Sequence, residues 1–236
     1  MDNKKNTILL TVIAVATLLV AVVGATFAYF TAQGGEAANT KVKVETGTAA
    51  SAAFDLTQEL NIYADAINFA DGKASRTGTA TGTVTWIAPG ATADHTPDEA
   101  ERSFCYTVDV TISSNNFVYT QADETAELLL NVTKGSSEIT EGLSGLTYAT
   151  VNGRATSGDT PELVDLKGWD ITKVTNGTVV NIPGTNGNKH KLVADAGAKA
   201  IDTWKTSVTL VNLNADQTSN TGKTFEAKLN FTKVDC

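Results

Sequence analysis

Histidine, cysteine and serine are the residue types that would carry catalysis or metal binding, and here they form no known motif. The only two histidines are His95 and His190, whereas common zinc proteases need two histidines one helical turn apart with a glutamate beside the first. The Gly-x-Ser-x-Gly turn of an activated serine is also absent. His95 lies in an acidic loop that is either simply solvated or a loose cation site, and the polar neighbours of His190 indicate an exposed turn. We therefore expect no enzymatic activity, no metal and no cofactor.

The cysteines are the second candidate chemistry. Cys105 and Cys236 are the only two in the chain, and an oxidising compartment would favour a disulfide between them. If they face each other across antiparallel strands, Val110 lies opposite Phe231, which pairs one apolar residue with another. Two free thiols, or a Cys236 that bridges two chains, are the alternatives.

The N-terminal segment indicates the compartment. Residues 8–30 carry no charged side chain, a length that could span the hydrocarbon core of a bilayer, about 30 Å. Thr26 and Ala28 also fit the −3 and −1 positions of an export signal, so that cleavage would leave Tyr29 as the new N-terminus. We expect residues 1–28 to be removed and the remainder to be secreted. A permanent membrane anchor is the alternative.

The composition limits which partners and which fold class we expect. The formal net charge is −8 and the pI is about 4.8, so nucleic acid is a disfavoured partner and membrane contact is expected only through the uncleaved precursor. The chain contains 37 threonines among its 236 residues. Because β-branched residues suit a pleated, half-buried surface, this composition favours an all-β fold.

Alternation of apolar and polar residues predicts ten strands. The clearest are residues 104–112 and 225–231, where every second side chain is apolar. The other eight are 41–45, 78–87, 126–133, 146–151, 168–174, 178–182, 189–194 and 203–213. Residues 56–69 are ambiguous between a strand pair and a helix. So many short strands predict an antiparallel β-sandwich.

Three further local patterns complete the predicted fold. Asn176-Gly177, between residues 171–174 and 178–182, predicts a β-hairpin. Residues 96–101 have a capping hydroxyl, a proline and acidic residues, which predict one short helical insertion. A sugar-stacking platform of tryptophans is conceivable, but each lies within a strand pattern, so we expect core packing for Trp86, Trp169 and Trp204.

One segment resembles a known family. Residues 24–31, GATFAYFT, resemble the processing region, cut by a SipW-type signal peptidase, of the TasA/camelysin family of exported bacterial proteins. Residues 38–44 occupy the place of that family's first mature strand, and residues 87–90 followed by 104–113 resemble its Pro-Gly turn and long strand. The resemblance implies a jelly-roll-like β-sandwich that assembles into biofilm matrix fibres, in which the N-terminal segment of one subunit completes the sheet of the next. Some members are metallo-endopeptidases, an activity for which this sequence offers no motif.

The residues after the cleavage site support the same mechanism. Tyr29 and Phe30 precede a stretch of alanine, glycine and polar residues, after which Val42 and Val44 alternate with charged residues. A loosely tethered strand with one apolar face could add to the open sheet edge of a neighbouring copy, and head-to-tail repetition would give an open filament. The alternative is that this strand packs in its own sandwich. The expected organisation is a signal over 1–28, a donor-strand segment over 29–46 and a β-sandwich over 47–236.

The sequence therefore predicts a non-enzymatic structural subunit of a bacterial extracellular matrix or cell surface. Its main expected partner is another copy of itself, in a head-to-tail homopolymer, and an accessory or anchoring subunit is a second partner that the sequence leaves open. The first alternative is a membrane-tethered surface domain that binds a ligand or glycan. The second is a metal-dependent protease.

Overall fold

The computed structural model describes residues 50–56, 60–64 and 72–236. All of them belong to one compact unit, Lys41–Cys236. In this described part the only helical element is a 3₁₀ helix, η3 (Thr218–Asn220), and strands supply the rest of the regular structure.

Two antiparallel sheets make up the described unit, and we call them sheet A and sheet B. Sheet A has the order β1-β3-β11-β5-β8-β7, and β6 pairs with β5. Sheet B has the order β10-β4-β12-β2, and β9 pairs with β4. The strands of sheet A are β1 (Ser51–Leu56), β3 (Arg76–Ile87), β5 (Leu128–Lys134), β6 (Ser137–Glu138), β7 (Tyr148–Arg154), β8 (Leu163–Asp170) and β11 (Lys199–Leu210). Those of sheet B are β2 (Leu60–Tyr63), β4 (Ser103–Asn115), β9 (Val179–Asn181), β10 (Lys189–Val193) and β12 (Thr224–Val234).

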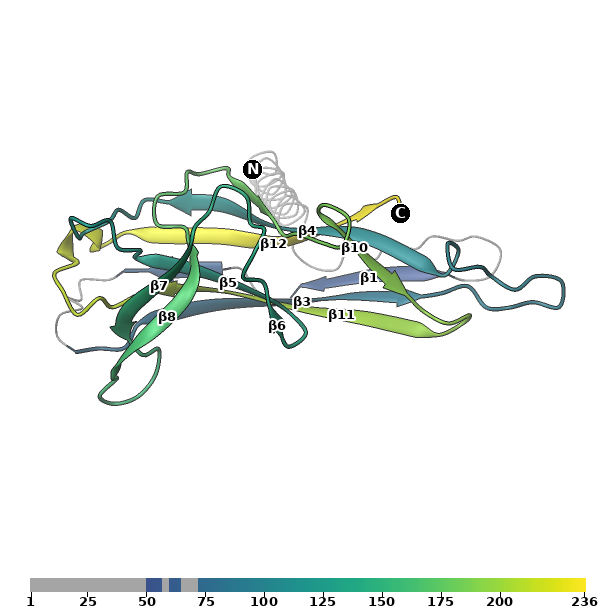
Figure 1. Cartoon of the computed structure of the whole chain (residues 1–236), viewed down its shortest axis with the longest axis horizontal. Helices are drawn as coiled ribbons and strands as arrows, with labels where there is room; N and C mark the ends of the chain where they lie inside the picture. The colour runs from purple at the N-terminus through teal and green to yellow at the C-terminus, as the bar shows by residue number, and fades with distance from the viewer. Residues whose placement is uncertain (1–49, 57–59, 65–71) are drawn as a thin grey trace, which may run out of the picture. The chain divides into compact units, whose positions relative to one another are not determined.

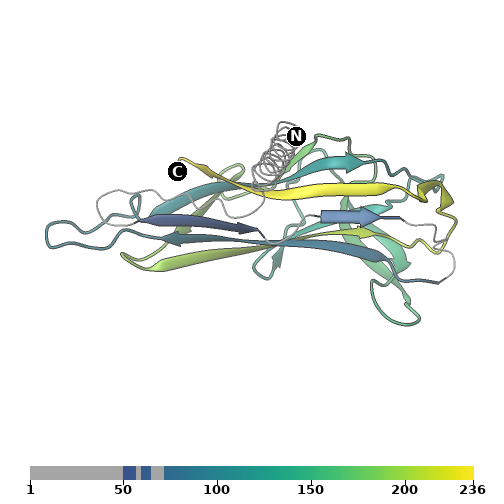
Figure 2. The ribbon, with the colours of Figure 1, turned by 180° about the vertical axis from the view of Figure 1, so that it is seen from behind.

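The two sheets pack face to face around one main core, with β4 and β12 in one layer and β3 and β11 in the other (Figures 1 and 2). Every second residue of β4 and β12 points into it, including Val108, Val110, Phe225 and Leu229. The predicted all-β antiparallel sandwich is confirmed. All three tryptophans are also buried, which confirms core packing and leaves no exposed tryptophan platform for a sugar.

Strand β3 shows how the sequence separates the two faces of a sheet. Its even positions, such as Ala80, Val84 and Trp86, are buried, and a threonine occupies each odd position from 77 to 85 on the outer face. We call this outer row the threonine ladder. Its β-branched side chains favour an extended backbone without adding to the core.

The register between β4 and β12 differs from the prediction. Val110 lies opposite Leu229, not Phe231, so the strands are shifted by two residues. Because side chains alternate with a period of two, this shift keeps the same residues facing the core. The alternation of inward and outward side chains therefore could not distinguish the two registers.

The predicted hairpin at Asn176-Gly177 is wrong. β8 ends at Asp170 in sheet A, and β9 pairs with β4 in sheet B. The Gly177 N–H donates to the Ile112 carbonyl at 2.7 Å, so this turn leads the chain from one sheet to the other. The residues of this turn suit a hairpin, but the strand that follows them, β9, pairs with β4 instead.

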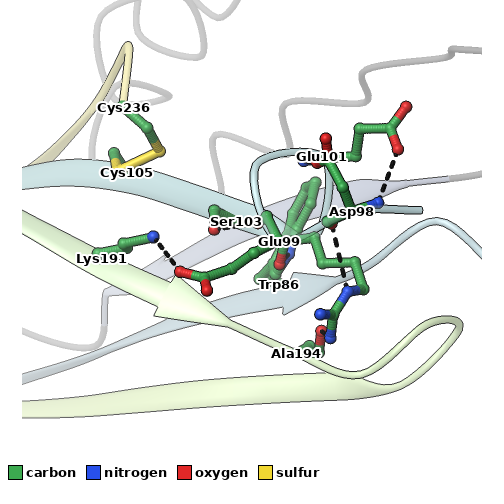
Figure 3. Close-up of polar contacts among 10 residues, drawn as sticks. Trp86, Asp98, Glu99, Glu101, Ser103, Cys105, Lys191, Ala194 and Cys236 are labelled. Carbon is green, nitrogen blue, oxygen red and sulfur yellow. Dashed lines mark hydrogen bonds and ion pairs between the residues drawn. A yellow bond between two sulfur atoms is a disulfide. The ribbon is translucent and has the colours of Figure 1, made fainter.

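The predicted helical insertion over residues 96–101 is a capped turn. The Asp98 N–H donates to Glu101 Oε2 at 2.9 Å (Figure 3). The Glu101 N–H donates back to Asp98 Oδ1, also at 2.9 Å. These are the reciprocal bonds of a helix N-terminus. β4 begins at Ser103, so no residues remain in which a helix could continue.

Candidate assembly edge

The chain passes from sheet A to sheet B between β1 and β2, and each of these two strands pairs with only part of its neighbour. β1 pairs with residues 82–87 of β3 in sheet A, and β2 pairs with residues 224–227 of β12 in sheet B. Among the described residues, no strand pairs with residues 229–234 of β12 on the side away from β4. We call this side of residues 229–234 the open edge.

The main-chain groups that face the open edge follow from strand geometry. The Ala64 N–H donates to the Lys223 carbonyl at 2.9 Å, which places the odd-numbered residues of β12 on the β2 side. The N–H and C=O groups of successive residues point to opposite sides of a strand. The main-chain groups that face the open edge are therefore those of Leu229, Phe231 and Lys233, whereas Thr232 pairs with Thr107 of β4.

Aromatic side chains lie beneath the open edge. The ring centroid of Phe231 is 5.8 Å from that of Phe54 on β1 and 6.3 Å from that of Tyr106 on β4. Phe104 extends the cluster, 5.9 Å from Phe54. Phe231 and Leu56 are only half-buried, unlike the rest of the core around them. A strand added here would cover the apolar surface that these two side chains expose.

Gly82 makes room for this arrangement. A Cβ atom at this position would lie 2.6 Å from Phe231 Cε2 and 2.8 Å from Leu56 Cδ2. The Phe231 ring from sheet B thus occupies the space that a side chain of sheet A would fill, a common reason for glycine inside a strand.

Gly82→Ala is expected to push the Phe231 ring outward and to destabilise the sandwich by about 1–3 kcal/mol, because the added methyl group overpacks this site. Urea unfolding measures the loss. Gly90→Ala is the matched control, since nothing lies within 4 Å of its Cβ position. Equal unfolding midpoints for both variants would contradict the assignment.

A disulfide lies at one end of the open edge. The structure joins Cys105 to Cys236 within the chain, with their Cα atoms 5.1 Å apart (Figure 3). Cys105 pairs in the ladder with Val234, the last residue of β12. Cys236 therefore reaches back from two residues beyond the strand, which explains why the register differs from a directly opposed cysteine pair.

A polar network crosses the core next to Phe231. The Tyr106 hydroxyl donates to Asp202 Oδ2 at 2.5 Å, and Trp204 Nε1–H donates to the Tyr106 oxygen at 3.0 Å. Lys134 Nζ lies 2.7 Å from Asp202 Oδ2. Burial raises the pKa of Tyr106, so its hydroxyl stays protonated and can keep donating. The network joins β4 of sheet B to β5 and β11 of sheet A.

His190 belongs to this buried region, which corrects the expected exposed turn. It is 5% exposed, and its ring centroid is 5.4 Å from that of Tyr106 and 4.8 Å from that of Trp204. His190 and Leu192 both point inward from β10. The polar neighbours obscured this alternation.

The burial of His190 predicts a pH-dependent stability. Burial, with the nearby charge of Lys134, lowers the pKa of His190 in the folded chain. Below about pH 6.5, the usual histidine value, the unfolded chain binds more protons, so stability falls as the pH drops through the folded-state pKa and then levels off. His190→Gln should reduce this fall, measured by urea unfolding at about pH 7.5 and about pH 5. His95→Gln is the control, since that side chain is 60% exposed; equal pH dependence in both variants would contradict the prediction.

The other predicted site residues lie outside the described residues. These are the cleavage pair Ala28 and Tyr29 and the donor-strand residues Tyr29, Phe30, Val42 and Val44. Within residues 50–56, 60–64 and 72–236, no helix is long and apolar enough to cross a membrane. The same ranges contain no group of three or more histidine, cysteine, aspartate or glutamate side chains that could hold a metal ion.

Comparison with known proteins adds no relative. No protein-family model matches the chain, and neither a curated protein nor a solved structure does. The open edge and the chemistry of the residues around it are therefore the basis for a functional proposal.

Proposed function

We propose that this chain is a secreted structural subunit of extracellular matrix fibres. In this proposal the N-terminal strand of one copy adds to the open edge of the next, and repetition of that contact builds the fibre. The observation that carries the proposal is the open edge of β12, where a run of main-chain groups has no described strand beside it. The resemblance of residues 24–31 to the TasA/camelysin family supports the same function.

The chemistry of the two partners is complementary. The open edge offers main-chain donors and acceptors over residues 229–234, with the half-buried Phe231 and Leu56 beside it. The proposed donor has Val42 and Val44 on one face and charged residues on the other. Strand addition would form ladder hydrogen bonds and place the two valines over exposed apolar surface. The charged face would remain in water.

Proline substitutions separate assembly from folding. Lys233→Pro removes an N–H that faces the open edge, so it should abolish fibre formation while unfolding in urea stays nearly unchanged, because edge strands tolerate proline there. Thr232→Pro is the matched control. Its lost N–H faces β4, so it should lower the free energy of unfolding by about 1–3 kcal/mol.

Negative-stain microscopy and sedimentation velocity of the purified mature chain would measure fibre formation. Wild-type protein that stays monomeric at high concentration would refute the proposal. Fibres of normal length from the Lys233→Pro variant would show that strand addition occurs elsewhere.

A further inference from the structure

We infer that the Cys105–Cys236 disulfide is a redox latch on the open edge, a step that rests on the proposed function. With the disulfide formed, residues 229–234 stay extended and can receive a partner strand. Reduction by a low-molecular-weight thiol releases the end of this segment, residues 232–236, from β4 and stops assembly, while the rest of the sandwich stays folded.

Leu229 and Phe231 pack in the core, but few described contacts hold residues 232–234 at the end of β12. On the β4 side these three residues have ladder pairing. Beyond the strand, Lys189 Nζ donates to the Asp235 carbonyl at 2.9 Å. Thr232 and Lys233 are exposed. A segment paired on one side, with exposed side chains, opens more readily than the core.

The disulfide acts at one end of β12. Residues 224–227 lie between β4 and β2, so this half of β12 has a strand on each side. The half that lacks a second described strand ends at the disulfide. The covalent bond therefore stabilises the part of β12 that strand pairing holds least, and it keeps that part extended along β4 while no donor is bound.

The two cysteines of the disulfide differ in their access to a reductant. Cys236 is exposed, whereas Cys105 is 5% exposed. A thiolate attacks the sulfur of Cys236, the bond between the two cysteine sulfurs breaks, and Cys105 leaves as a thiolate that takes up a proton. A second thiolate then attacks the mixed disulfide and releases Cys236. Two reductant thiols become one disulfide, and the protein gains two thiols.

The experiment uses the full mature chain, oxidised or treated with dithiothreitol, and follows hydrogen exchange before assembly begins. Reduction should speed exchange in peptides covering residues 232–236 by about tenfold or more, with residues 108–112 of β4, which pair with the part of β12 before residue 232, unchanged. Fibre growth, followed by light scattering, should stop on reduction and resume on reoxidation. A Cys105→Ser/Cys236→Ser variant should behave like the reduced chain and ignore dithiothreitol.

The outcomes separate the latch from the proposed function. Unchanged exchange over residues 232–236 would overturn the latch even if the oxidised chain forms fibres. Faster exchange in residues 108–112 as well would also overturn the latch, because the disulfide would then stabilise the sandwich as a whole. An oxidised chain that forms no fibres would refute the proposed function, whatever the exchange data show.

Discussion

A chain that lacks residues 29–45 is expected to fold and to remain monomeric under conditions in which the full mature chain forms fibres. The deletion removes both valines of the proposed donor strand but none of the described residues of the sandwich. Each copy would then keep an open edge with no strand to offer its neighbour. Sedimentation velocity and microscopy would measure the loss of assembly, and urea unfolding would show that the fold is retained.

Paired substitutions in the donor strand and a peptide-binding experiment extend this test. Val42→Asp/Val44→Asp should also prevent assembly because it removes the apolar face of the donor, whereas Lys41→Ser/Lys43→Ser changes only the opposite face and should still polymerise. A synthetic peptide of residues 29–45 should bind the truncated chain. Retained fibres from the truncated chain would refute strand donation, and a large loss of stability on deletion would instead favour a strand packed in its own sandwich.

Glu127→Ala is expected to cause a large loss of stability, about 2–4 kcal/mol, through buried groups left without partners. The Glu127 side chain is fully buried, one residue before β5 begins. The Thr120 N–H donates to Glu127 Oε1 at 2.9 Å, and the Thr120 hydroxyl donates to the same oxygen. Gln217 Nε2–H donates to Glu127 Oε2. This carboxylate thus joins the segment before β5 to the segment before η3.

Urea unfolding of three variants would check this assignment. Glu124→Ala is the control, because that side chain is 68% exposed and its ion pair with Lys173 lies at the surface, where such pairs contribute about 0–1 kcal/mol. Glu127→Gln keeps the shape but loses one acceptor oxygen, so it should fall between the other two. A Glu127→Ala chain as stable as Glu124→Ala would show that the buried carboxylate is not needed.

The positions of most strands could be predicted because alternation is a local signal. Residues 104–112 and 225–231 read as strands from their own side chains, and both became long central strands of sheet B. The pairing of strands was harder, because it depends on the edges left vacant once other strands are in place. The Asn176-Gly177 turn shows this, since its sequence suits a hairpin and yet β9 pairs with β4.

Side chains that are buried by partners distant in the sequence show the same limit. Nothing local marks Glu127 as buried, because its partner Gln217 lies 90 residues away along the sequence. His190 was missed for a similar reason, as its aromatic neighbours come from β4 and β11. The open edge itself depends on where β2 stops along β12, a property of the pairing and not of any motif.

The threonine ladder has a consequence for how separate fibres would behave in water. The outer face of β3 presents a hydroxyl at every second residue from 77 to 85, and hydroxyl groups hold a hydration layer that apolar side chains would shed. Two such faces gain little free energy by coming together, because little apolar surface is removed from water. In the proposed fibre, this face of β3 would therefore add little to side-by-side association between filaments.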